Sequence, residues 1–116
     1  MFGLTTSHRF LLYGKVVDFR KGFDGLCGLV RNELSRDPLS GEVFIFMNRP
    51  RTRLKLLQWQ HGGFVLYYKR LEKGTFSFPI SANNDSASRI SYSEMVLMIE
   101  GIKVEKWIEN PRYKIL

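Results

Sequence analysis

The feature that most constrains the fold is a pair of strand-like segments separated by a short turn signal. Residues 53–60 (RLKLLQWQ) and 64–71 (FVLYYKRL) flank His61, Gly62 and Gly63. Aliphatic and aromatic runs on either side of a glycine-containing turn are typical of a β-hairpin. Since side chains alternate along a strand, one face of the first arm carries Arg53, Lys55, Leu57 and Trp59, and the other carries Leu54, Leu56, Gln58 and Gln60.

Three further segments predict strands beside this hairpin. Residues 42–48 (EVFIFMN) would place apolar side chains on both faces of a strand, which indicates a central strand. Residues 10–17 (FLLYGKVV) indicate a short strand interrupted at Gly14. Residues 75–78 (TFSF) would add a fourth short strand, so 42–78 predicts an antiparallel meander.

A first helix is predicted over residues 19–34, with Asp18 as its N-cap. Gly22, Gly25 and Gly28 oppose this helix, because glycine costs about 1 kcal/mol relative to alanine in a helix interior. We expect them to permit close approach to the sheet, with approach to a DNA backbone as the alternative. The apolar stripe of helical period consists of Phe19, Phe23, Leu26, Cys27, Val30 and Leu34.

The C-terminal part reads as a connector followed by a second helix. Residues 81–89 (SANNDSASR) are small and polar, as in an exposed connector. Ser91 or Ser93 can cap a helix that contains the apolar run 95–99 and ends near Gly101. That run either packs in the core or docks a partner. The pattern leaves the packing of the tail around Trp107 open.

The 116 residues suit one small domain of the α+β class. We expect an antiparallel meander of about four to five strands, covered by the N-terminal helix and accompanied by a C-terminal helix. Residues 1–80 would form the helix-plus-sheet core. Residues 81–116 would add the connector, second helix and tail to the same domain.

Positive charge is concentrated in one part of the chain. The net charge is +7, and residues 49–73 hold seven cations and one anion, a net +6, whereas 1–48 and 74–116 are nearly neutral. Such a cluster indicates either a solvated face or a surface for an anionic partner. With two cations from the start of the first helix, the candidate DNA-binding residues are Arg20, Lys21, Arg49, Arg51, Arg53, Lys55, Lys69, Arg70 and Lys73.

Aromatic residues are interleaved with these cations. Trp59, Tyr67 and Tyr68 lie on the two arms of the hairpin. Aromatic faces can stack on bases while cations contact phosphates. The competing interpretation is that Trp59 and one tyrosine belong to the core of the sheet.

Groups that would support catalysis do not converge in the sequence. His8 lies near the N-terminus, and His61 suits a turn. Cys27 lies on an apolar stripe, and Asp18 and Asp24 suit a helix start. Neither a Walker-type loop nor a G-x-G-x-x-G motif occurs. We therefore expect no enzyme activity, no cofactor and no metal.

The location of the protein is predicted from what the sequence lacks. One cysteine allows no internal disulfide, which fits a reducing compartment. No signal peptide and no apolar run of about 18 residues is present. We expect a cytoplasmic protein.

Ordered motifs point to a family. The chain carries D-F-R-K-G-F-D-G-L at 18–26, S-G-E-V-F-I-F at 40–46, R-L-K-L-L-Q-W at 53–59 and Y-K-R-L-E-K-G-T-F at 68–76, followed by S-x-x-E-M-V-L-M-I-E-G-I at 91–102. These blocks resemble the TnpB-type accessory protein of the insertion-sequence sixty-six transposon family. The chain departs from the usual family pattern at Phe19, where methionine is common, and at Gln60 and His61, where the tip is usually acidic.

The resemblance implies a protein encoded beside a larger transposase and needed for efficient transposition, with no catalytic residues of its own. The expected partners are DNA, at transposon ends and with low specificity, and the cognate transposase, which would place the protein at the nucleoid. A module that docks the transposase without touching DNA is the alternative.

Overall fold

The computed structural model describes residues 3–78 and 87–101, which form five strands, two α-helices and one short 3₁₀ helix. The hairpin and its neighbours begin and end close to the predicted positions. In chain order the elements are β1 (Phe10–Val16), α1 (Phe23–Asn32), η1 (Pro38–Ser40), β2 (Val43–Met47), β3 (Arg53–Gln60), β4 (Gly63–Arg70), β5 (Ala87–Ile90) and α2 (Tyr92–Glu100).

The strands form a single sheet in the order β4-β3-β2-β1-β5. The meander β2-β3-β4 is antiparallel as predicted, and β5 is antiparallel to β1. The expectation of a wholly antiparallel sheet was wrong, because β1 and β2 are parallel. Helix α1 lies between them in the chain and carries it back to the same end of the sheet, as a parallel connection requires. The α+β class is confirmed.

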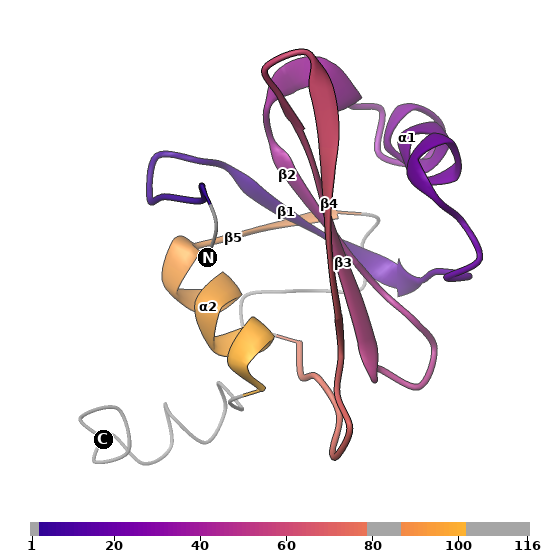
Figure 1. Cartoon of the computed structure of the whole chain (residues 1–116), viewed down its shortest axis with the longest axis vertical. Coiled ribbons are helices and arrows are strands. Elements are labelled where there is room, and N and C mark those ends of the chain that lie inside the picture. Colours follow the sequence, from indigo (N-terminus) through magenta and orange to yellow (C-terminus); the bar gives the residue numbers. More distant parts are fainter. Residues whose placement is uncertain (1–2, 79–86, 102–116) are drawn as a thin grey trace.

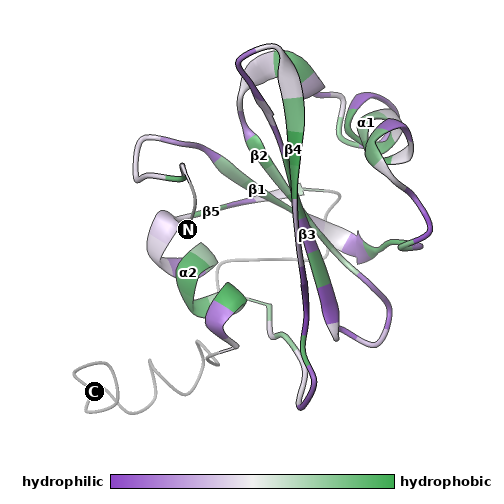
Figure 2. Ribbon diagram, viewed as in Figure 1, coloured by the Kyte–Doolittle hydropathy of each residue, from purple (hydrophilic) through white to green (hydrophobic). Residues whose placement is uncertain are grey.

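The two helices cover opposite faces of the sheet (Figure 1). Helix α2 buries Met95, Met98 and Ile99 against Leu54 and Leu56 of β3. On the other face, Leu26, Cys27 and Val30 of α1 belong to the same cluster as Leu57. The predicted alternation along β3 is therefore confirmed, and the 95–99 run packs mainly in the core. Figure 2 shows hydrophobic residues along the strands and α2, and largely hydrophilic turns.

Helix α1 begins later than predicted, with Gly22 as its N-cap. Asp18 is not a helix cap. Its carboxylate instead accepts the backbone N–H of Arg20 at 2.9 Å, and its carbonyl accepts the N–H of Lys21 at 3.1 Å. This turn replaces the first predicted helical turn, because contacts with the sheet described below hold residues 19–21 out of a helix.

The glycines of α1 do not all serve close packing. A Cβ at Gly28 would meet no atom within 4 Å, so the predicted close approach to the sheet is wrong there. A Cβ at Gly25 would lie 3.0 Å from the Cβ of Lys21. The close neighbour of Gly25 is thus the preceding loop rather than the sheet.

Two predictions about the chain between β4 and α2 were wrong. Residues 75–78 form no strand, although the N–H of buried Phe76 donates to the Arg51 carbonyl at 2.7 Å. Residues 87–89 are not connector but part of β5, so the sheet extends beyond residue 80; residues 81–86 lie outside the described part.

The predicted cap of α2 is confirmed, because Ser91 and Glu94 form a reciprocal capping box. The tail likewise lies outside the described residues.

Candidate nucleic-acid interface

Arg53 and Arg70 lie directly opposite each other at the open end of the β3–β4 hairpin. Like charges at directly opposite positions destabilise a sheet. Arg53 Nη1 donates to the Tyr68 hydroxyl at 2.7 Å, and Arg70 Nε donates to the Glu72 carboxylate at 2.7 Å. A sheet that needed only stability would favour opposite charges at this position. The pair of arginines therefore suits a surface that receives an anion.

The turn between β2 and β3 holds two more arginines beside this pair. The Asn48 carboxamide oxygen accepts the N–H of Thr52 at 2.9 Å and of Arg53 at 3.0 Å. Arg51 adopts a left-handed backbone with φ of 58°. Both Arg49 and Arg51 are exposed. The turn thus presents their guanidinium groups to solvent from a backbone that Asn48 fixes.

The loop after β4 is hydrogen-bonded to the same turn. The N–H of Leu71 donates to the Thr52 carbonyl at 2.8 Å, and the N–H of Phe76 donates to the Arg51 carbonyl at 2.7 Å. These two bonds bracket Lys73, which is exposed. Lys73 is therefore kept near the arginines of the turn.

Lys55 does not belong to the cationic surface, contrary to prediction. Its side chain is 4% exposed, and its Nζ donates to the backbone carbonyls of Phe19 at 3.0 Å and Lys21 at 2.9 Å. The ammonium also lies 4.7 Å from the centre of the Phe19 ring and 5.0 Å from that of Tyr68. Lys55 instead fastens the 18–22 loop to the sheet, which places Arg20 near the hairpin cations.

Lys69 is a second predicted candidate with a structural role. Its Nζ donates at 2.7 Å to the carbonyl of Ile99 in the last turn of α2. A lysine at this position satisfies a carbonyl that the helix leaves unpaired and complements the helix dipole. The side chain thus faces α2, on the side of the sheet away from Arg53.

The aromatic residues divide between core and surface. Tyr67 packs against the core under α2, and Trp59 makes an edge contact with Phe64 at 5.0 Å between ring centres. Tyr68 is 45% exposed although its ring also meets Phe19. Among the three predicted stacking residues, Tyr68 is the one that is exposed and lies beside Arg53.

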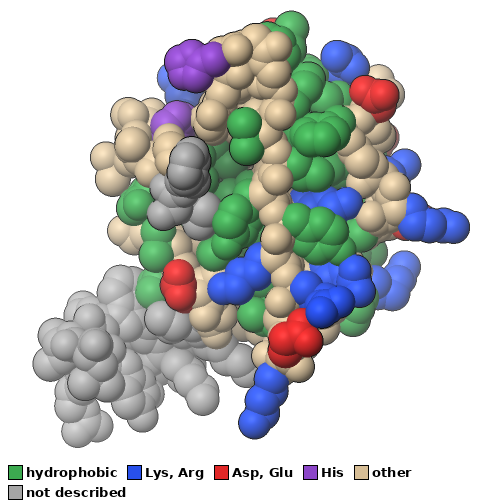
Figure 3. Space-filling view, viewed as in Figure 1, with side chains coloured by type: hydrophobic (Ala, Val, Ile, Leu, Met, Phe, Trp, Pro, Cys, Tyr) green, Lys and Arg blue, Asp and Glu red, His purple; other side chains and the backbone are tan. Residues whose placement is uncertain are grey.

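Seven of the nine predicted cations gather where β2 ends, β3 begins and β4 ends. In Figure 3, Lys and Arg side chains collect over this lower end of the sheet. We call this surface the basic end of the sheet, and it consists of Arg20, Lys21, Arg49, Arg51, Arg53, Arg70 and Lys73.

Carboxylates balance part of this charge. Arg20 contacts Asp18 at 2.6 Å, and Arg70 contacts Glu72 at 2.7 Å. Hydrogen bonds from the Arg20 side chain and backbone lower the pKa of Asp18 to about 2. The basic-end cations without an acidic side-chain contact in the described residues include Arg49, Arg51 and Arg53.

Three features of the described residues bear on catalysis and on membrane insertion. Cys27 is buried, as predicted, and burial raises the pKa of its thiol. Within residues 3–78 and 87–101, no cluster of three or more His, Cys, Asp or Glu side chains can hold a metal ion. The same part of the chain contains no helix that is long and apolar enough to span a membrane.

Two residues shape the basic end in ways that the sequence did not predict: Asn48 was not among the candidates, and Lys55 was predicted to bind DNA. Asn48 orders the turn, and Lys55 holds the 18–22 loop. The combination of Asn48 with Pro50 is a local turn signal that could have identified the first. The contacts of Lys55 join residues 34 and 36 positions apart, and no local pattern marks them.

Comparison with known proteins gives a consistent result. The family model for the IS66 Orf2 like protein matches residues 8–109. The uncharacterized protein y4jC of Sinorhizobium fredii (strain NBRC 101917 / NGR234) is 35% identical over 102 residues, covering 88% of this chain and 86% of its own. Protein y4hO of the same strain, also uncharacterized, is 35% identical over 86 residues, covering 73% and 72%. No solved structure matches.

Proposed function

The chain belongs to the family of IS66 Orf2-like proteins, which indicates a transposition-associated accessory protein, and from this premise we propose that it acts by binding DNA through the basic end of the sheet. In this proposal the cognate transposase performs strand cleavage and joining. The accessory protein contributes contacts with the DNA backbone beside it.

The observation that carries the proposal is the opposed pair Arg53 and Arg70 with the exposed arginines of the adjoining turn. Guanidinium groups bind phosphate oxygens in bidentate fashion, and one row of phosphates can neutralise several of them together. Tyr68 adds an exposed aromatic surface beside Arg53. Phosphate contacts position a protein without reading the bases, so we expect low sequence specificity.

The number of contacts fixes the expected salt dependence. Four cations of the basic end lack an acidic partner among those described and adjoin the hairpin: Arg49, Arg51, Arg53 and Lys73. Four phosphate contacts give a slope of log K against log salt of about −3.6, hence a roughly 150-fold loss of affinity between about 50 and 200 mM salt. Fluorescence anisotropy measures the affinity and its salt slope, with one labelled duplex of the transposon-end sequence and one of shuffled sequence.

Three variants test individual contacts. Arg49→Gln and Arg53→Gln each remove one charge, and Arg51→Gly removes a charge while giving the left-handed position the residue that favours it. Each should reduce the slope by about one unit and weaken both duplexes equally. Arg31→Gln is the matched control, because Arg31 is an exposed cation on α1. Melting curves verify that every variant is folded.

The proposal fails if a triple variant that combines Arg49→Gln, Arg51→Gly and Arg53→Gln binds DNA with the affinity and salt slope of the parent protein. If that variant has lost co-purification with the transposase instead, the docking module is the correct function. An Arg31→Gln effect equal to that of Arg49→Gln would show that net charge alone matters. Cleavage of end DNA by the isolated protein with Mg²⁺ would contradict the non-catalytic role.

A further inference from the structure

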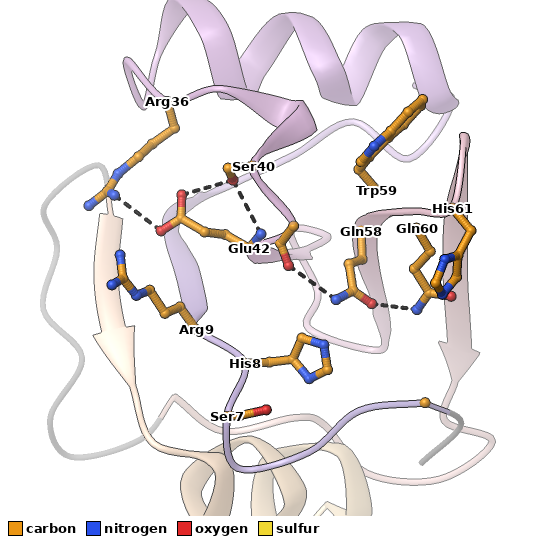
Figure 4. A pocket seen from close by; sticks show the side chains of 12 residues that line it. Ser7, His8, Arg9, Arg36, Ser40, Glu42, Gln58, Trp59, Gln60 and His61 are labelled. Atoms are coloured by element: carbon orange, nitrogen blue, oxygen red, sulfur yellow. Dashed lines mark hydrogen bonds and ion pairs between the residues drawn. The ribbon is translucent and has the colours of Figure 1, made fainter.

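A cavity of about 770 Å³ lies beside the turn that joins β3 to β4. The basic end lies at the opposite end of β3, where this strand begins. Figure 4 shows three segments around the cavity: residues 7–9 immediately before β1, the η1 region with Arg36 and Glu42, and the last residues of β3. These segments are distant in sequence. The cavity therefore exists only in the folded protein.

Two acceptor groups of the cavity, the Glu42 carboxylate and the Gln58 amide oxygen, are already engaged. The Glu42 carboxylate accepts from Arg36 Nη1 at 3.1 Å through one oxygen and from the Ser40 hydroxyl at 3.1 Å through the other. The amide oxygen of Gln58 accepts from Gln60 Nε2 at 2.6 Å, while its nitrogen donates to the Gly41 carbonyl at 3.1 Å. The side chain of Glu42 is 11% exposed. A ligand therefore meets little unsatisfied negative charge here.

Donor groups, in contrast, remain available. His8 Nδ1 accepts the N–H of Thr5 at 3.0 Å, so in the neutral ring the proton lies on Nε2, which can donate. Figure 4 shows the His8 ring directed into the cavity. Arg9 is exposed and makes no side-chain hydrogen bond or ion pair with any residue that the structure describes. Arg36 uses one of its five N–H groups on Glu42.

This combination of donors selects an anion, and the volume selects one larger than a simple ion. Small-molecule pockets measure roughly 300 to 1,000 Å³. The hairpin side of the cavity adds the Gln60 side chain, an amide that suits the edge of a base. We propose that this cavity binds a nucleotide, with the phosphate at Arg9, Arg36 and His8 and the base toward Gln60.

A nucleotide explains the lining better than an acidic peptide does. A carboxylate side chain would occupy the cationic side only and would make no use of the Gln60 amide on the hairpin side. The proposal stands apart from DNA binding at the basic end, since it uses none of the same residues. A single nucleotide bound in the cavity would leave the basic end free.

Isothermal titration calorimetry with deoxyadenosine 5′-monophosphate tests the proposal on the full chain. We expect saturable binding with a Kd of about 1 mM or tighter. Arg9→Gln should weaken it by about ten-fold or more, because it removes a charge-assisted hydrogen bond. Arg31→Gln and Arg49→Gln should leave nucleotide affinity unchanged. The Arg49 variant separates this site from the basic end, whose DNA affinity it lowers in the proposal above.

Three ligand controls make the outcome decisive. Deoxyadenosine without phosphate and inorganic phosphate without a base should both bind more weakly than the nucleotide. Equal binding by either one would overturn the assignment of the cavity. Tighter binding of the dipeptide Asp-Glu would identify a peptide site instead, and absence of saturation at about 10 mM nucleotide would leave no site of useful affinity.

Discussion

Replacing Gly28 by alanine should stabilise the protein. Gly28 lies inside α1, and a Cβ built there meets no atom within 4 Å, so the methyl group causes no overpacking. Alanine is favoured over glycine in a helix interior by about 1 kcal/mol. The unfolding entropy is about 2.1 cal/mol/K per residue, so for 116 residues a gain of about 1 kcal/mol corresponds to a rise in Tm of about 4 °C. Thermal unfolding followed by circular dichroism at the helix signal measures it.

Gly25 provides the matched comparison within the same helix. A methyl group there lies 3.0 Å from Lys21 Cβ and 3.1 Å from Cγ, and the Lys21 carbonyl is bonded to Lys55. The loop cannot shift without straining that bond, so the gain in helix propensity is offset. We expect Gly25→Ala to show no increase in Tm. An unchanged or lower Tm for Gly28→Ala, or equal increases for both variants, would refute the reasoning.

Two further changes probe the 18–22 loop. Arg20→Gln should raise the pKa of Asp18 from about 2 toward its ordinary value. The ion pair of Asp18 and Arg20 therefore stabilises the fold above about pH 4, and this stabilisation is lost as the pH falls toward 2. A carboxyl carbon NMR titration measures the pKa of Asp18, and an unchanged pKa in the variant would contradict the prediction. Lys55→Met should lower the free energy of unfolding by about 2 to 4 kcal/mol, because two backbone carbonyls lose a charged donor. Urea denaturation measures this loss, with Lys15→Met as the control because Lys15 is exposed. Equal stability of the two variants would contradict the prediction.

Elements with local signals were predicted from the sequence. The bounds of β3 follow from alternation of side chains around a glycine turn, and α2 follows from the Ser91–Glu94 capping box. Strand β5 escaped prediction because its four residues, ASRI, carry no strand pattern of their own and are ordered by pairing with β1. The start of α1 was misplaced because Lys55 binds carbonyls that a helix would have used.

The candidate site was partly predictable for a similar reason. Cations that are neighbours in sequence, such as Arg49, Arg51 and Arg53, stay neighbours in a turn and the strand that follows it. Sequence charge does not reveal whether a lysine meets solvent or a carbonyl, so Lys55 and Lys69 were assigned to the surface. The cavity had no signal, since its walls come from three separated segments.

The pairing of β1 with β5 has a consequence for how the chain is made. Phe10 pairs with Ile90, eighty positions later, whereas β2, β3 and β4 pair with near neighbours in the chain. During translation the outer edge of β1 and the apolar face that α2 covers stay open until residues 87–101 have left the ribosome. The nascent protein thus passes through a stage in which the edge of β1 is unpaired and the core face that α2 later covers is exposed. Chaperones recognise such a surface, and it promotes aggregation.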